Sequence, residues 1–227
     1  MKPIQNIIQI AGIKDADEAQ LLIDAGVDYL GFPLRLEVHQ EDISEEAAGR
    51  IIRASKPSTY GVLITYLDKA SAIVALCTQL GTNIVQLHGR ITIKELALIK
   101  EIDPEMSIIK SLIICGNNLP DLQIELEQYT PFVEAFITDT YDPTTGASGA
   151  TGKTHDWSIS RKLVEVSAKP IILAGGLNSD NVAQAIAIVR PAGVDVHTGV
   201  EGPDGRKDRK KVSEFVIAAR TAFTNSV

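Results

Sequence analysis

The sequence alternates eight times between a short apolar run and a segment with helical spacing, which limits the folds open to it. The runs are nearly continuous in Ile, Val and Leu, as in parallel strands that are buried on both faces. A helix candidate follows each run, and this repetition predicts a single-domain (β/α)8 TIM barrel over residues 1–227. The strands are expected at 7–12, 28–34, 60–65, 83–89, 107–114, 134–140, 170–176 and 193–199.

A doubly wound open sheet is the alternative arrangement. Such folds often carry a GxGxxG turn after the first strand, whereas this chain has "IAGIKDAD" (10–17) there. The chain has no linker, low-complexity tract or shift in composition that would divide it. We therefore favour the barrel and expect one domain.

Composition excludes several classes of partner. A net charge of -7 and a pI near 5.1 argue against nucleic acid and against anionic membranes. The one basic run, "GRKDRKK" (205–211), is short and contains Asp208, so it is predicted to be the solvated start of a helix. The N-terminal residues lack the apolar core of a signal peptide and a run of about 20 apolar residues. A cytoplasmic protein is expected.

Metal binding is not expected from the cysteines or histidines. Cys77 and Cys115 lie in apolar stretches without a CxxC pair, so both are predicted to be buried structural thiols. The four histidines fall in four separate loops, and no HxH or HxxxH pair exists.

In a barrel, functional groups lie at the C-terminal ends of strands and in the loops that follow. All four histidines fall in such places: His39, His88, His155 and His197. A histidine in a loop more often has no functional role than a catalytic one, so an exposed side chain without a function is the alternative interpretation for each of the four. Asp139 ends the apolar stretch "FITDT", where burial would raise its pKa and suit a general acid. Capping of the following loop by its carboxylate is the competing interpretation.

Glycine-rich loops follow the last three expected strands. The first, 141–157, is long and rich in Gly, Thr and Ser, as binding loops are, but it lacks the GxxxxGK[ST] spacing of a P-loop. The other two, "LAGGLNSDN" (173–181) and "DVHTGVEGPDG" (195–205), flank the place where barrel enzymes often bind phosphate. Gly175, Gly176 and Gly199 are the candidate phosphate-binding residues. The alternative interpretation is that these glycines are needed only for tight turns with positive φ angles.

Several motifs resemble those of the phosphoribosylanthranilate isomerases: "VQLHG" (85–89), "ITDT" (137–140), "GKTHDW" (152–157), "LAGGLNSDNV" (173–182) and "GVDVHTGVEGPDGRKD" (193–208). The resemblance runs the whole length of the chain and keeps the order of the motifs. It implies a (β/α)8 barrel that catalyses an Amadori rearrangement of a phosphorylated aminoaldose without a cofactor. A monomer or homodimer with a small phosphorylated sugar as its substrate is expected.

The resemblance also implies roles for individual residues. Asp139 matches the family's general acid, and Gly175, Gly176 and Gly199 match its phosphate loops. Other positions in or beside the matching motifs are expected to contact substrate: Gly12, Arg35, His88, Gly152 and Asp195.

Departures from the family gather at the same end of the expected barrel. Ala11 stands where the family has its catalytic cysteine base, and Gln9 stands where it has a lysine. His197 replaces a serine and His155 a phenylalanine. Arg35 is displaced from the family's carboxylate-binding arginine. If a base remains, it would be His39, His197 or a water held by Gln9.

Three functions follow from these observations. The first is an Amadori isomerase with Asp139 as its acid and a replacement base. The second is an isomerase, epimerase or lyase that acts on a different phosphorylated sugar through His39 and His197. The third is a non-catalytic phosphosugar-binding protein.

Overall fold

A computed structural model describes residues 4–36, 41–55, 57, 59–142, 147–148 and 154–225. Within these residues, eight parallel strands close into a barrel, because β5 pairs with β6 and the first strand pairs with the last. A ninth, short strand pairs antiparallel with β6. The strands are β1 (Ile7–Ala11), β2 (Tyr29–Pro33), β3 (Tyr60–Thr65), β4 (Ile84–Leu87), β5 (Ser107–Ile114), β6 (Ala135–Asp142), β7 (Ala147–Ser148), β8 (Ile171–Leu173) and β9 (Gly193–Val196).

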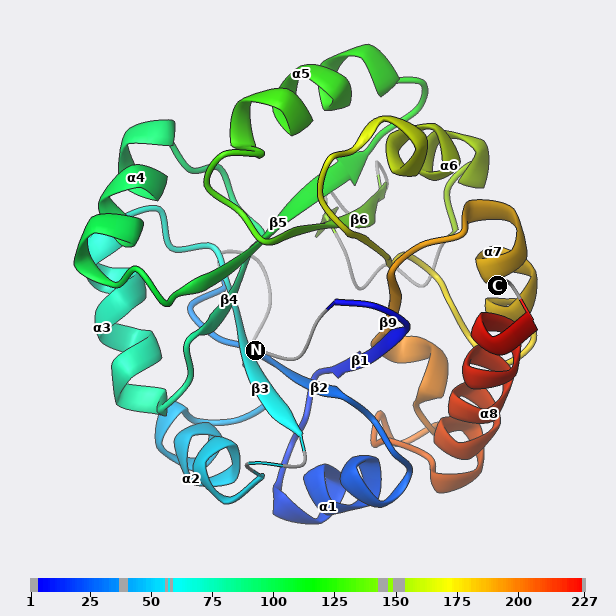
Figure 1. Ribbon diagram of the computed structural model, residues 1–227. Helices are drawn as coiled ribbons and strands as arrows, with labels where there is room; N and C mark the ends of the chain where they lie inside the picture. The colour runs from blue at the N-terminus through cyan, green and yellow to red at the C-terminus, as the bar shows by residue number, and fades with distance from the viewer. Residues whose placement is uncertain are drawn as a thin grey trace.

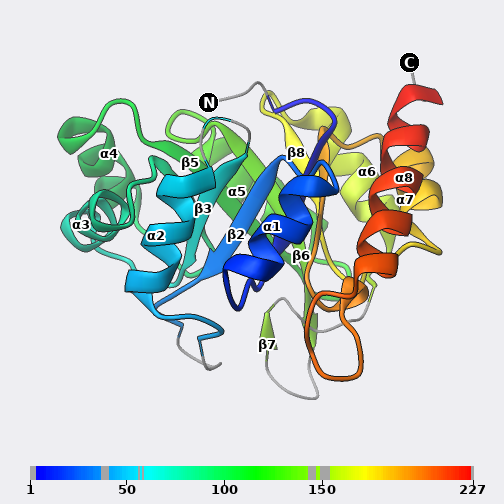
Figure 2. The same cartoon turned by 90° about the horizontal axis from the view of Figure 1, so that it is seen from below.

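Helices surround the strands as an outer ring (Figure 1), which confirms the predicted (β/α)8 barrel. Seen from the side, β7 and the loop before the last helix lie at one end of the barrel (Figure 2). The helical elements are α1 (Ala16–Asp24), α2 (Glu45–Ser55), α3 (Ala70–Leu80), α4 (Ile93–Ile102), α5 (Leu119–Tyr129), α6 (Trp157–Val166), α7 (Val182–Val189), the 3-10 turn η1 (Thr198–Val200) and α8 (Arg209–Asn225).

Local signals start and stop these helices, as α1 illustrates. The Asp15 carboxylate accepts a hydrogen bond from the Glu18 amide (2.9 Å), and the Glu18 carboxylate accepts one from the Lys14 amide (2.9 Å). These bonds satisfy amides that a helix start would leave without a partner. Gly26 follows the helix with φ of +82°, a conformation that costs glycine little.

Two apolar layers form the core. The larger layer packs the outer face of the barrel against the helices. The smaller one fills the barrel interior with side chains such as Ile7, Tyr29, Ile109 and Ile172. The nearly continuous apolar runs of the sequence therefore reflect strands that are buried on both faces.

Five predicted strands extend past the observed C-terminal ends, among them the strands that become β4, β8 and β9. β4 ends one residue before His88, and β9 ends one residue before His197. β8 ends before Gly175 and Gly176, whose φ angles of +95° and +62° are incompatible with an extended strand. These residues therefore belong to the loops that form the rim of the barrel.

The cysteine prediction is correct for one residue and wrong for the other. Cys77 is buried in α3, and burial raises the pKa of its thiol to about 12. Cys115 is exposed, because it lies just past the end of β5 in the turn before α5. Across the described ranges, no helix is long and apolar enough to cross a membrane.

Candidate active site

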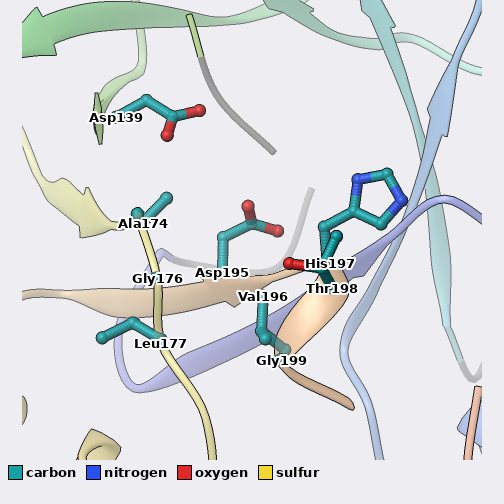
Figure 3. Close-up of a pocket in the computed structure, with 10 residues that line it drawn as sticks. Asp139, Ala174, Gly176, Leu177, Asp195, Val196, His197, Thr198 and Gly199 are labelled. Carbon is teal, nitrogen blue, oxygen red and sulfur yellow. The ribbon is translucent and has the colours of Figure 1, made fainter. Parts of the chain in front are cut away.

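A pocket opens at the C-terminal ends of β6, β8 and β9 (Figure 3), which is the rim where barrel enzymes place their chemistry. Two buried carboxylates, a turn that contains two glycines and the loop after β9 form it. Its lining residues are Asp139, Ala174, Gly175, Gly176, Leu177, Asp195, Val196, His197, Thr198 and Gly199.

Glycines shape one side of the pocket. A Cβ added at Gly199 would lie 1.9 Å from the carbonyl oxygen of Leu177, so the loops after β8 and β9 approach each other backbone to backbone. A Cβ added at Gly175 would lie 2.2 Å from the hydroxyl of Thr140. The 3-10 turn η1 begins two residues after the end of β9, so the glycine-lined side of the pocket presents main-chain atoms and few side-chain atoms to a ligand. Such surroundings suit a phosphate.

Asp139 and Asp195 stand next to this glycine-lined side, and each is only 8% exposed. Burial raises the pKa of Asp139, against the opposing effects of His88 and of the Thr140 amide, which donates to its carboxylate (2.7 Å). Burial and the neighbouring charge of Asp139 raise the pKa of Asp195 to about 7. Two carboxyl groups in this arrangement hold a proton near neutral pH, as a general acid requires. The bond from the Thr140 amide fits the capping interpretation, and it is compatible with the predicted role of Asp139 as an acid.

A second and larger cleft, of about 540 Å³, lies on the β3–β5 side of the rim. His88 lines it, with Nδ1 3.1 Å from the hydroxyl of Ser111 and its ring against the edge of Tyr66. Lys110 also lines it; this ammonium donates to the carbonyl of Ser111 (2.8 Å), and burial lowers its pKa to about 8. The volume is in the range of small-molecule sites.

His155 is half-buried and connects β6 to α6. Its Nδ1 lies 2.9 Å from the hydroxyl of Thr140 and its Nε2 lies 2.6 Å from the hydroxyl of Ser160. Burial lowers the pKa of His155 to about 4, so the ring is neutral and ties the residue after Asp139 to α6.

His197 is held by charged neighbours that the sequence did not reveal. Its Nε2 lies 3.5 Å from a carboxylate oxygen of Glu201 and 3.9 Å from one of Asp42. Lys207 donates to that same Glu201 oxygen (2.8 Å) and to the carbonyl of His197 (3.1 Å). The prediction of a solvated basic run is therefore wrong for Lys207, whose side chain is fully buried because these partners compensate its charge.

The structure does not bring every predicted residue to the pocket. Arg35 forms an ion pair with Glu45 of α2, its amide donates to Glu41 (2.6 Å), and it lines neither cleft. Gln9 donates to the side chain of Gln86 inside the barrel (2.8 Å). The predicted residues His39 and Gly152 lie outside the described residues.

Comparisons with known proteins agree with this geometry. A family model described as N-(5'-phosphoribosyl)anthranilate (PRA) isomerase matches residues 8–218. An N-(5'-phosphoribosyl)anthranilate isomerase 2 from Methanosarcina mazei is 36% identical over 217 residues, which are 95% of this chain and 95% of that protein. A crystal structure of phosphoribosyl anthranilate isomerase in complex with reduced 1-(o-carboxyphenylamino)-1-deoxyribulose 5-phosphate is 28% identical, with a TM-score of 0.78 over 95% of this chain and 98% of the other. Monomers generated from the dimeric isomerase of Thermotoga maritima are 29% identical, with the same TM-score and coverage.

Proposed function

The chain belongs to the phosphoribosylanthranilate isomerase family, and from that premise we propose that it isomerises N-(5'-phosphoribosyl)anthranilate in tryptophan biosynthesis. The reaction converts an aminoaldose phosphate into a 1-amino-1-deoxyketose phosphate and is an intramolecular oxidation and reduction. An acid first protonates the ring oxygen, which opens the sugar to an iminium ion. A base then removes the C2 proton to give an enolamine, which tautomerises to the ketose.

The pocket supplies a proton donor for the first step. Asp139 is the proposed acid, because it is buried at the end of β6 and burial raises its pKa toward the range that a general acid needs. Asp195 assists it, since the charge of either carboxylate opposes ionisation of the other. The 5'-phosphate binds against Gly175, Gly176 and Gly199, where main-chain groups are accessible.

The anthranilate end extends toward the cleft on the β3–β5 side. A substrate with its phosphate between the loops after β8 and β9 has its reacting carbons beside Asp139 and its aromatic ring toward His88 and Tyr66. The aromatic rings of Tyr66 and His88 line this cleft, and the size of the cleft suits a flat aromatic group.

One observation carries the proposal: a buried proton donor and a glycine-lined phosphate site share one pocket at the rim of a barrel of this family. The comparisons do not favour an epimerase, a lyase or a non-catalytic binding protein. We further propose that the chain acts as one domain over residues 1–227, as a monomer or homodimer, without a cofactor. The Thermotoga maritima protein described as dimeric supports the second assembly.

The test is the decay of fluorescence of freshly prepared phosphoribosylanthranilate. The native chain is expected to accelerate this decay, and Asp139→Asn is expected to lower kcat by about 10² to 10⁴. Asp121→Asn, a change on the exposed surface of α5, is the matched control and should keep native activity. A native chain that leaves the substrate unchanged at micromolar enzyme would refute the proposal.

A further inference from the structure

The second step of the proposed reaction needs a base, and the side chain at the end of β1 cannot provide one. Ala11 has only a methyl group, which packs with the apolar side chains of the barrel interior. We propose that His197 is the general base that removes the C2 proton. This inference rests on the proposed function and adds a catalytic residue to it.

Pairing of β1 with β9 brings His197 to the end of β1. The two strands pair in parallel with Gln9 opposite Asp195 and Ile10 opposite Val196. Ala11 and His197 follow these last paired residues, so both lie at the C-terminal end of the strand pair. His197 also lines the pocket that holds Asp139 and Asp195.

Contact with Gly12 places the imidazole over the end of β1. A Cβ added at Gly12 would lie 1.9 Å from Nε2 of His197 and 2.5 and 2.6 Å from two ring carbons. The ring therefore occupies the space that a side chain at residue 12 would fill, directly after Ala11. Gly12 has φ of +75°, a second reason why this position suits glycine. A nitrogen base thus lies at the strand end that lacks its own reactive group.

Carboxylates stabilise the cation that this base becomes. Glu201 and Asp42 approach Nε2 at 3.5 and 3.9 Å, and both are close enough to favour an imidazolium. Lys207 orients Glu201 and holds the carbonyl of His197, so the loop that carries the base is fixed from below. The arrangement resembles other catalytic histidines, in which a carboxylate positions the ring and stabilises its protonated form.

The proton transfer balances with the groups present. Because Nε2 faces Glu201 and Asp42, the Nδ1 lone pair of His197 takes the C2 proton. The C2–H electrons form the C1=C2 bond, and the C1=N electrons return to nitrogen. The imidazolium then gives its proton to C1 of the enolamine, and the C2 hydroxyl loses a proton to leave the ketone. That proton replaces the one that Asp139 gave to the ring oxygen, so both groups are regenerated and no other reagent is consumed.

The experiment removes the imidazole at residue 197 and introduces a thiol at residue 11. The native chain, His197→Ser, Ala11→Cys and the double variant Ala11→Cys/His197→Ser are assayed with phosphoribosylanthranilate. His197→Ser is expected to lower kcat by about 10² to 10⁴ with little change in KM. The double variant is expected to recover at least about tenfold over His197→Ser, because a thiolate at residue 11 can take the same proton.

His197→Gln is the matched control, since it keeps a polar side chain of similar length but cannot accept the proton; it should be as slow as His197→Ser. Inhibition by inorganic phosphate should stay native in both variants, which shows that they fold and retain the phosphate loops. Native kcat in His197→Ser, or a double variant no faster than His197→Ser, would overturn this proposal alone. A native chain without isomerase activity would overturn the proposed function and this proposal together.

Discussion

The two buried carboxyl groups of Asp139 and Asp195 lead to a prediction about pH dependence. The two carboxyl groups are buried in one pocket, and the charge of Asp139 helps to raise the pKa of Asp195. A general acid must carry its proton in order to donate it, so activity falls as rising pH removes the last proton from the pair. Asp195→Asn removes the repulsion, so the remaining carboxyl group loses its proton at lower pH. The basic limb of the pH profile should therefore move downward.

The structure sets the size of this effect. The pKa of Asp195 rises from 3.8 to about 7, with burial as the larger cause and the charge of Asp139 as the next. At ~1.36 kcal/mol per pH unit, this rise corresponds to about 4 kcal/mol in favour of the neutral carboxyl group. Repulsion is the smaller of these two causes, so the basic limb should move by roughly one pH unit, which is less than the whole rise.

The assay is kcat/KM for phosphoribosylanthranilate from about pH 5.5 to about pH 9 at constant ionic strength. Asp156→Asn serves as the control, because Asp156 caps α6 outside the pocket and asparagine caps a helix about as well. Its profile should match that of the native chain. A basic limb of Asp195→Asn that stays in place or moves upward would refute this reasoning about the two carboxyl groups.

Two further predictions concern binding and stability. Gly199→Ala should raise KM about tenfold or more, because its Cβ would force the Leu177 carbonyl away and separate the two phosphate loops. Gly202→Ala is the control and should leave KM unchanged, because the nearest atom to its Cβ is a side-chain oxygen of Asp204 at 3.0 Å. Arg220→Met should lower the free energy of unfolding in urea by about 2–3 kcal/mol, because it removes the ion pair of 2.6 Å from the buried Asp28 carboxylate. Adding Asp28→Asn should restore most of this loss, and a double variant as unstable as Arg220→Met would contradict the reasoning.

The barrel and the buried carboxylate at the end of β6 could be predicted from the sequence because their signals are local. A buried parallel strand needs a continuous apolar run, and a helix on its surface needs a periodic apolar face, so eight repeats of this pattern indicate the fold. Asp139 is recognisable because a carboxylate is costly at the end of an apolar strand. Gly175 and Gly176 are recognisable because positive φ angles favour glycine.

The neighbourhood of His197 depended on closure of the barrel. Pairing of the first and last strands brings His197 onto Gly12 from far along the chain, and no local pattern records that register. The same closure buries Lys207 beside Glu201, whereas its sequence neighbours are those of a solvated helix start. Arg35 likewise turns to Glu45 rather than to the pocket. Local periodicity thus determined which segments become strands and helices, while contacts between distant segments decided which polar side chains meet, because the burial of a charge depends on partners that only the closed barrel supplies.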